Sequence, residues 1–197
     1  MQNNYIAERG DYVYHLENTI IASIQSAIER MLAAQGIAGW TVARSNQPTI
    51  QAIQNNTVYF DIISKHRLGV QAQKPVQIDG DWYNATRWYE EWIVQLSAFK
   101  QRTEEDTTRT WTSTDVLTQV QACVNGGGNT SEPTRYAWWP ESYINIVRST
   151  DLREIDFETD SGLKEKMPQF DFTMILEQGL MAAVPTIDDI EMDVQPI

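Results

Sequence analysis

Residues 56–102 hold the sequence pattern that most constrains how this chain can fold. In the second half, 82–99, Trp, Tyr, Ile and Val are frequent, and such side chains favour the pleated surface of a β-strand. The apolar residues also alternate along the chain. One parity holds Trp82, Trp88, Trp92, Val94 and Leu96, and the other holds Tyr83, Tyr89, Ile93 and Phe99.

A second β-branched and aromatic run at residues 57–64 offers this strand a partner. Between the two runs lie Pro75 and the sequence Asp-Gly-Asp at 79–81, which are typical of turns. We therefore predict a long antiparallel pair with its turn near Asp-Gly. The competing interpretation is a helix over 86–99, because several of the same apolar residues also recur at helical spacing.

Length and composition indicate one folded domain. The chain has 197 residues, 42 % of them hydrophobic, which is enough to bury a core. No stretch approaches the length of apolar sequence that spans a bilayer, and no signal peptide is evident, so we expect no membrane association. The single cysteine, Cys123, excludes an internal disulfide and fits a reducing compartment.

The net charge of −12 is concentrated near the C-terminus. Residues 151–197 hold twelve Asp and Glu against three Lys and Arg, whereas residues 1–150 hold fifteen against twelve. Proteins that bind nucleic acid usually present a basic surface. We therefore expect no sequence-specific binding of nucleic acid, and an acidic surface that would repel a DNA backbone moving past it.

Two amphipathic helices and several strands complete the expected fold. The first helix covers residues 18–35, with Asn18 or Thr19 as its cap and Gly36 at its end. The second covers 113–124 and opens with a capping-box pattern at 112–115. Further strands are expected at 40–44, 143–147 and 170–177, with a polar excursion over 152–168.

These elements predict an α+β fold: a mostly antiparallel β-sheet with two α-helices packed on one face, plus an extended C-terminal arm. The expected domain organisation is a single α+β domain over residues 1–180 and an acidic C-terminal arm over 181–197.

The sequence shows no coherent catalytic or cofactor chemistry. The glycines at 126–128 follow a helix and lack the Lys-Ser/Thr of a phosphate loop. His15 and His66 have no second ligand at helical spacing, so we expect no metal. A triad of Cys123, His66 and Asp61 can be written on paper, but a free cysteine on an apolar helix face usually packs as a small hydrophobe. No cofactor is therefore expected.

Two further features leave alternatives open. Glu90 and Glu91 point to opposite faces of a strand, so one is expected to be solvated and the other to form a structural ion pair with Arg87 or Lys65, rather than the two acting as paired catalytic carboxylates. Trp138 and Trp139 lie in a loop, where paired aromatics either pack beneath the fold or bind a partner. The sequence does not separate these two interpretations.

The order of elements and several short sequence segments resemble those of the neck or tail-terminator proteins of long-tailed bacteriophages, over most of residues 12–180. The segments are TVYFDIISKHRLGVQ (57–71), WYEEWIVQLSAF (88–99), TSTDVL (112–117), INIV (144–147), STDLRE (149–154) and MPQFDFTM (167–174). The acidic segment after about residue 180 lies outside this resemblance.

The resemblance implies a structural virion protein that is not an enzyme. It implies a homo-oligomeric ring, expected to be a hexamer, that caps the tail tube and joins it to the neck, with DNA passing through. The implied partners are further copies of the chain, the tail tube, a sheath protein where there is one, and a neck or head-completion protein. The implied location is the tail–neck junction of the virion, after assembly in the host cytoplasm.

Other interpretations are another tail-completion or head–tail joining protein, or a small cytoplasmic enzyme or ligand-binding domain.

A ring larger than a dimer needs two unlike surfaces on each subunit. The expected basic surface lies on or beside the long strand pair, and the expected acidic one is the C-terminal arm, which is as readily interpreted as a solvated tail. The candidate interface residues are Lys65, Arg67, Arg87, Lys100, Arg102, Trp138, Trp139, Ile187, Asp188, Asp189, Ile190 and Glu191.

Overall fold

The computed structural model describes residues 14–45, 54–101, 110–126, 138–139, 141, 143–158 and 164–183. Within these residues lie two helices and one six-stranded sheet, which confirms the expected α+β class. The elements are α1 (Glu17–Ala34), β1 (Thr41–Arg44), β2 (Thr57–Ile78), β3 (Asp81–Phe99), α2 (Ser113–Val124), β4 (Ile144–Ser149), β5 (Arg153–Glu158) and β6 (Lys164–Ala183).

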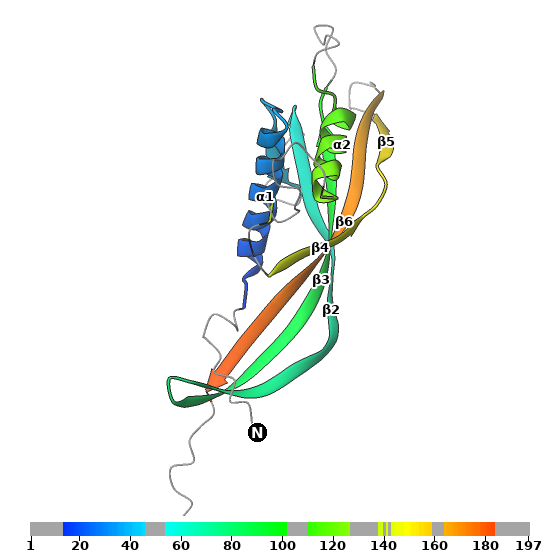
Figure 1. The fold of residues 1–197 in the computed structure, drawn as a ribbon. Helices are drawn as coiled ribbons and strands as arrows, with labels where there is room; N and C mark the ends of the chain where they lie inside the picture. Colours follow the sequence, from blue (N-terminus) through cyan, green and yellow to red (C-terminus); the bar gives the residue numbers. More distant parts are fainter. Residues whose placement is uncertain are drawn as a thin grey trace, which may run out of the picture.

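The strands run in the order β1-β2-β3-β6-β4, and β5 also pairs with β6. The pairing of β1 with β2 is parallel, and all the other described pairings are antiparallel. Three of the strands, β2, β3 and β6, are about 20 residues long and form the spine of the molecule (Figure 1). No helix in the described part of the chain is long and apolar enough to span a membrane.

The expected long hairpin is confirmed, and the alternative helix over 86–99 is wrong because β3 is one continuous strand. Asp79 and Gly80 form its two-residue turn, with φ values of 53° and 95°. Positive φ at both positions is typical of the type I′ turn, which matches the twist of a hairpin. Pro75 is not in the turn but lies opposite Asn84 within β2. Because this stretch of β2 is an edge, the missing N–H of Pro75 is tolerated there.

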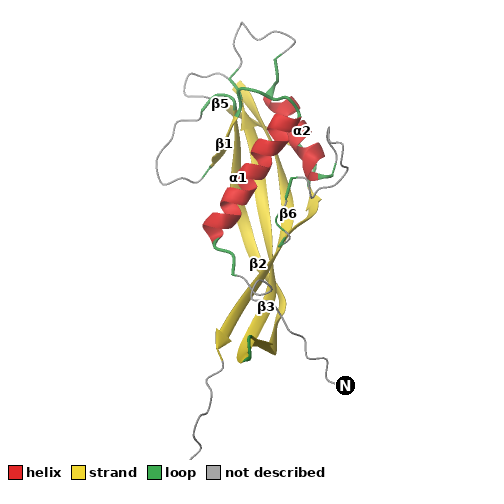
Figure 2. Ribbon diagram, turned by 60° about the vertical axis from the view of Figure 1, so that its left-hand side comes forward, coloured by secondary structure: helices red, strands yellow, loops and turns green. Residues whose placement is uncertain are grey.

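Both helices lie on the same face of the sheet (Figure 2), as expected. The even-numbered residues of β3 from Trp88 to Ala98 point towards them, and all of these except Glu90 are buried. Matching positions on β6, from Phe170 to Leu176, extend this core between the sheet and the helices. Alternation along two paired strands therefore gives the helices their apolar platform.

A side chain caps the start of α2, but no side chain caps the start of α1. Thr112 and Asp115 form the expected capping box at the start of α2. The expected cap of α1 is wrong: its N-cap is Leu16, with no side-chain hydrogen bond, and Asn18 and Thr19 lie within the first turn. Gly36 follows the end of α1 at φ +69°, a conformation that suits glycine.

The sheet extends well beyond the helices, so the molecule has a wide body and a narrow projection (Figures 1 and 2). We call this projection the arm. It consists of residues 69–87 and 179–183 of β2, β3 and β6, and it is not the acidic C-terminal arm that the sequence predicts. A second small core of Val76, Ile78 and Ala85 lies within it, flanked by Tyr83 and Met181. The arm is therefore a packed three-stranded ribbon and not a loop.

The polar excursion expected over 152–168 is wrong, because β5 and the start of β6 pair with one another there. The exposed side chains of β5 explain the polar pattern, since one strand at the outside of a sheet needs little apolar sequence. β6 continues to Ala183, beyond the expected domain boundary at 180, and residues 184–197 lie outside the described part of the chain.

Candidate assembly surfaces: the waist and the arm

The body and the arm meet at a narrow waist, where β2 and β3 carry charged and aromatic side chains on the helix-side face. Lys65 lies opposite Trp92 in the strand register, and Arg67 lies opposite Glu90. Because residues two apart on a strand share a face, Trp88, Glu90 and Trp92 form a row on β3, beside Lys65 and Arg67 on β2.

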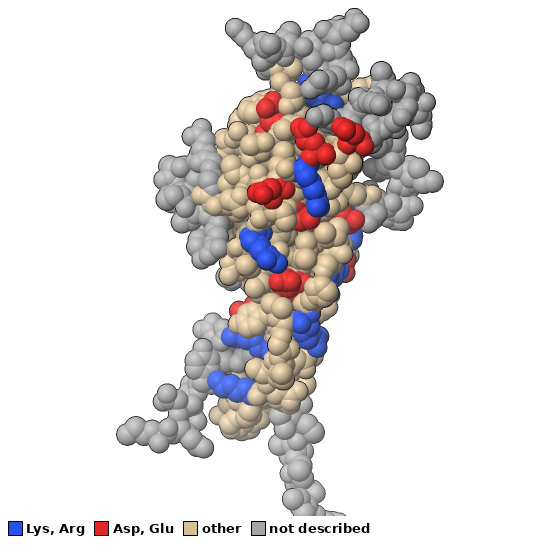
Figure 3. Space-filling model, turned by 90° about the vertical axis from the view of Figure 1, so that its right-hand side faces the viewer, with Lys and Arg blue, Asp and Glu red and all other residues tan. Residues whose placement is uncertain are grey.

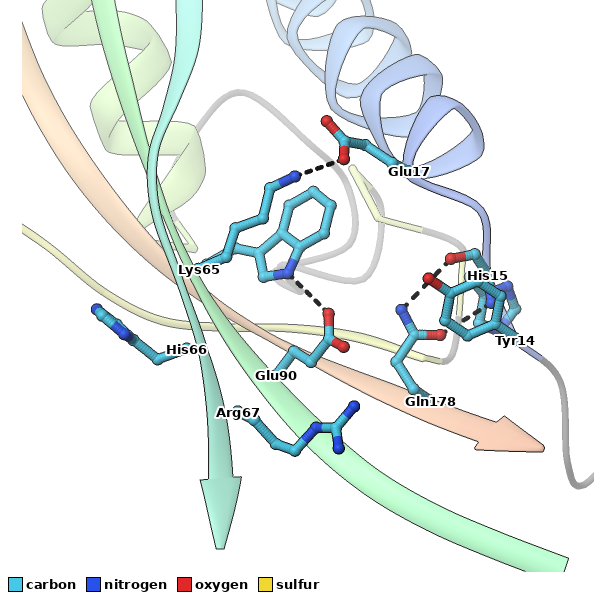
Figure 4. A pocket seen from close by; sticks show the side chains of 9 residues that line it. Tyr14, His15, Glu17, Lys65, His66, Arg67, Glu90 and Gln178 are labelled. Carbon is cyan, nitrogen blue, oxygen red and sulfur yellow. Dashed lines mark hydrogen bonds and ion pairs between the residues drawn. The ribbon is translucent and has the colours of Figure 1, made fainter. Parts of the chain in front are cut away.

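These side chains form a connected ladder, of which Figure 4 shows Lys65, Arg67 and Glu90. The carboxylate of Glu90 accepts the indole N–H of Trp88 at 2.9 Å and that of Trp92 at 3.1 Å. The ammonium of Lys65 lies 4.4 Å from the centre of the Trp92 ring, and the guanidinium of Arg67 lies 4.9 Å from that of Trp88. Such cation–π contacts are stabilising, and here they hold two exposed cations against two buried rings.

The ladder also reaches the first helix. Lys65 Nζ lies 2.6 Å from Glu17 Oε2, and Arg44 Nη2 lies 3.6 Å from the other oxygen of that carboxylate. The hydrogen bond from Lys65 lowers the pKa of Glu17, and the charges of Lys65 and Arg44 act in the same direction. The start of α1 is thereby tied to β1 and β2.

A second contact ties the segment before α1 to β6. The backbone N–H of His15 donates to Gln178 Oε1 at 2.8 Å, and the His15 ring stacks on Tyr143 with 3.5 Å between ring centres. Burial lowers the pKa of His15. Gln178 is itself almost fully buried, so its amide is committed to this contact.

The waist encloses a shallow pocket of about 270 Å³ between these residues. Its lining is Tyr14, His15, Glu17, Lys65, His66, Arg67, Glu90, Trp92 and Gln178. In its lining, Lys65 pairs with Glu17 and Glu90 accepts the indole N–H of Trp92, and the described residues contain no group of three potential metal ligands. The geometry is that of a structural joint between body and arm.

The basic cluster expected on the long strand pair is not one surface. Lys65 and Arg67 share the helix-side face at the waist, whereas Arg87 lies on the opposite face and pairs with Glu177 at 2.8 Å. The physical reason is the alternation of side chains along β3, which separates residue 87 from residues 88, 90 and 92. Lys100 follows the body end of β3, and Arg102 lies outside the described residues.

The ion pair expected for one of Glu90 and Glu91 is not what Glu90 forms. Glu90 instead serves both indole N–H groups, while Lys65 pairs with Glu17 and Arg87 with Glu177. A carboxylate has two oxygens, so it can accept both indoles at once.

Trp138 and Trp139 are buried in the core of the body. Of the two interpretations that the sequence left open, packing within the fold is therefore the correct one. They are 4 % and 3 % exposed, and Trp139 lies against Phe172 of β6. Arg30 of α1 donates to the carbonyl oxygen of Trp138 at 2.6 Å. Cys123 is buried as well, and burial raises its pKa, so it packs as a small hydrophobe.

The strongest surface features were not found from the sequence. Val70 is 94 % exposed, and Trp82 and Leu180 are about half exposed, all three in the arm. The sequence shows Trp82 as part of the aromatic strand. Its exposure follows from its position in the arm, away from the body. Ile187, Asp188, Asp189, Ile190 and Glu191 lie outside the described residues.

Comparison with known protein families matches residues 19–186 to the model of the family described as E217 gateway protein gp29. The chain belongs to this gateway protein family. No curated protein matches the chain. The match runs from α1 to the end of β6, so it includes the body, the waist and the arm.

The family is one of phage structural proteins of the head–tail gateway, which agrees with the resemblance to phage neck proteins.

Proposed function

We propose that copies of this chain form a closed ring, expected to hold six subunits, at the junction between a phage head and its tail. The observation that carries the proposal is the gateway-family match, which covers body and arm alike. The chain acts by assembly and not by catalysis, and it uses no cofactor.

The shape of the subunit supports this role. One end is a wide body with two helices on the sheet, and the other is a bare three-stranded arm (Figure 2). A ring of such subunits has two unlike faces, as a part that joins two different structures needs.

In its finer form, the proposal is that the ring caps the finished tail tube, stops its growth and docks it to the neck, with DNA passing through the opening. The tail tube, a sheath where present, and a neck or head-completion protein are the partners. A net charge of −12 suits a ring that lets DNA slide without binding it. We place the ring in the virion, after assembly in the host cytoplasm.

The test is a phage in which this gene is deleted, examined by electron microscopy and complemented by the full chain. The terminator role predicts free heads together with overlong or unstable tails, and rescue by complementation. Normal joined virions in the deletion lysate would refute the proposal.

A second candidate is joining without termination. The family description favours it, because "gateway" names a passage and not an end to tube growth. Its distinguishing result is a deletion lysate with tails of normal length that are not attached to heads.

A further inference from the structure

The described sheet has two open edges that lie on opposite sides of the molecule. β1 pairs only with residues 57–60 of β2, so from Asp61 to Ile78 no described strand lies on the outer side of β2. On the other side, β4 and β5 are the outermost strands, both paired with β6. We call these the β2 edge and the β4–β5 edge.

The two edges carry opposite net charge. Residues 57–78, which form β2, hold three bases and one acid, a net charge of +2. Residues 144–158, which include β4 and β5, hold two bases and four acids, a net charge of −2. Figure 3 shows a related division, with Lys and Arg prevailing over the narrow arm and Asp and Glu more frequent over the body.

Each edge also exposes two large aliphatic side chains. On the β2 edge these are Ile63, 49 % exposed, and Val70, 94 % exposed. On the β4–β5 edge they are Val147, 52 % exposed, and Ile155, 44 % exposed. Apolar side chains surrounded by charged ones are typical of interfaces between proteins.

The β2 edge is unsuited to continuous backbone pairing with another strand. Its register shifts between Ile62 and Ser64 and again between Leu68 and Ala72, and Pro75 has no N–H to donate. Gly69, at φ +68°, forms the second irregularity and leaves Val70 projecting from the strand. Contacts through side chains therefore suit this edge better than backbone pairing does.

From these observations we infer that the β2 edge of one copy binds the β4–β5 edge of the next copy. Like edges would bring +2 against +2 or −2 against −2, whereas unlike edges bring opposite charges together. A contact between two unlike surfaces repeats from copy to copy and can close a ring. The inference rests on the proposed ring and names its subunit interface.

The test uses one variant at each edge. Val70→Asp and Ile155→Lys each place a charge where an aliphatic side chain is expected to be buried, and each new charge opposes the net charge of its own edge; both side chains are exposed in the single subunit. Tyr89→Asp is the matched control, since Tyr89 is 45 % exposed but lies on the sheet face and not at an edge. Near-ultraviolet circular dichroism checks that each variant is folded.

The readout is mass by light scattering over a range of protein concentrations. We expect the wild type and the control to form a large assembly that weakens with salt, and each edge variant to associate at least about tenfold more weakly. Mixing the two edge variants should give a one-to-one species of twice the chain mass of 22.6 kDa, because each keeps the edge that the other lacks.

Three results would overturn the inference: assembly of either edge variant as strong as the wild type, a mixture with no one-to-one species, or a wild type that is monomeric at every concentration. Failure of the proposed function is a separate result, since it appears as joined virions in the deletion lysate. A ring that persists in the edge variants leaves that function standing and refutes only the interface.

Discussion

Replacing Glu90 tests whether the waist ladder stabilises the fold. Glu90→Ala removes the acceptor of two indole N–H groups, at 2.9 and 3.1 Å, on side chains that are 6 % and 3 % exposed. A hydrogen bond to a charged group contributes about 1.5–3 kcal/mol, and an unsatisfied buried donor costs a similar amount. Because Glu90 itself is partly exposed, we expect a total loss of about 2–4 kcal/mol in the free energy of unfolding.

Two companion variants make the result specific. Glu90→Gln keeps one acceptor oxygen, so we expect about half of that loss. Glu91→Ala removes the same charge one residue along, on the opposite face of β3, and should stay within about 0.5 kcal/mol.

The assay is urea unfolding followed by far-ultraviolet circular dichroism at one fixed protein concentration. With an m-value of about 2.5 kcal/mol/M, Glu90→Ala should lower the midpoint by roughly 1 M. Equal midpoints for Glu90→Ala and Glu91→Ala would show that the charge, and not the two indole contacts, is what matters.

Four further predictions concern other parts of the chain. Trp139→Ala should lower the free energy of unfolding by about 3–5 kcal/mol in urea unfolding, because the indole is buried in the body core. Gly80→Ala should lower it by about 1 kcal/mol in the same assay, because φ at this turn residue is +95°. Burial lowers the pKa of His15 from 6.5, so the unfolded chain takes up a proton first as pH falls; stability should fall below about pH 6.5, and His15→Gln should flatten melting temperatures there. Truncation after Val184 should reduce incorporation into tails at low and high salt if the acidic segment binds a neighbouring copy, and equal incorporation at both salts would contradict that proposal.

Elements governed by local chemistry could be predicted from the sequence. The second helix has the predicted bounds, 113–124, because a capping box starts it and Gly126 follows its end. The hairpin turn at Asp79 and Gly80 was predictable for the same reason, since few sequences adopt positive φ at two successive positions. In both cases the deciding residues lie within a few positions of one another.

The waist could not be predicted, because it depends on register between strands. Stacking of Arg67 on Trp88 and of Lys65 on Trp92 requires the strand register between the two irregularities of β2, which no local pattern specifies. The burial of Trp138 was equally inaccessible, since its contact with Arg30 spans more than 100 residues of chain. Where a side chain's environment comes from distant segments, the sequence leaves several answers open.

The two irregularities of β2 explain how one sheet serves both body and arm. They lie on either side of Lys65 and Arg67, and such bulges locally increase the twist of a strand. β3 and β6, by contrast, pair without a shift from Ser97 and Gln169 to Tyr83 and Ala183.

β2 therefore bends at the waist, while β3 and β6 pass through it without an irregularity. Side chains of β2 and β3 contact one another there and hold the two strands together. These contacts restrain the arm relative to its body. In the ring proposed above, a restrained arm would let identical contacts between neighbouring copies repeat and close.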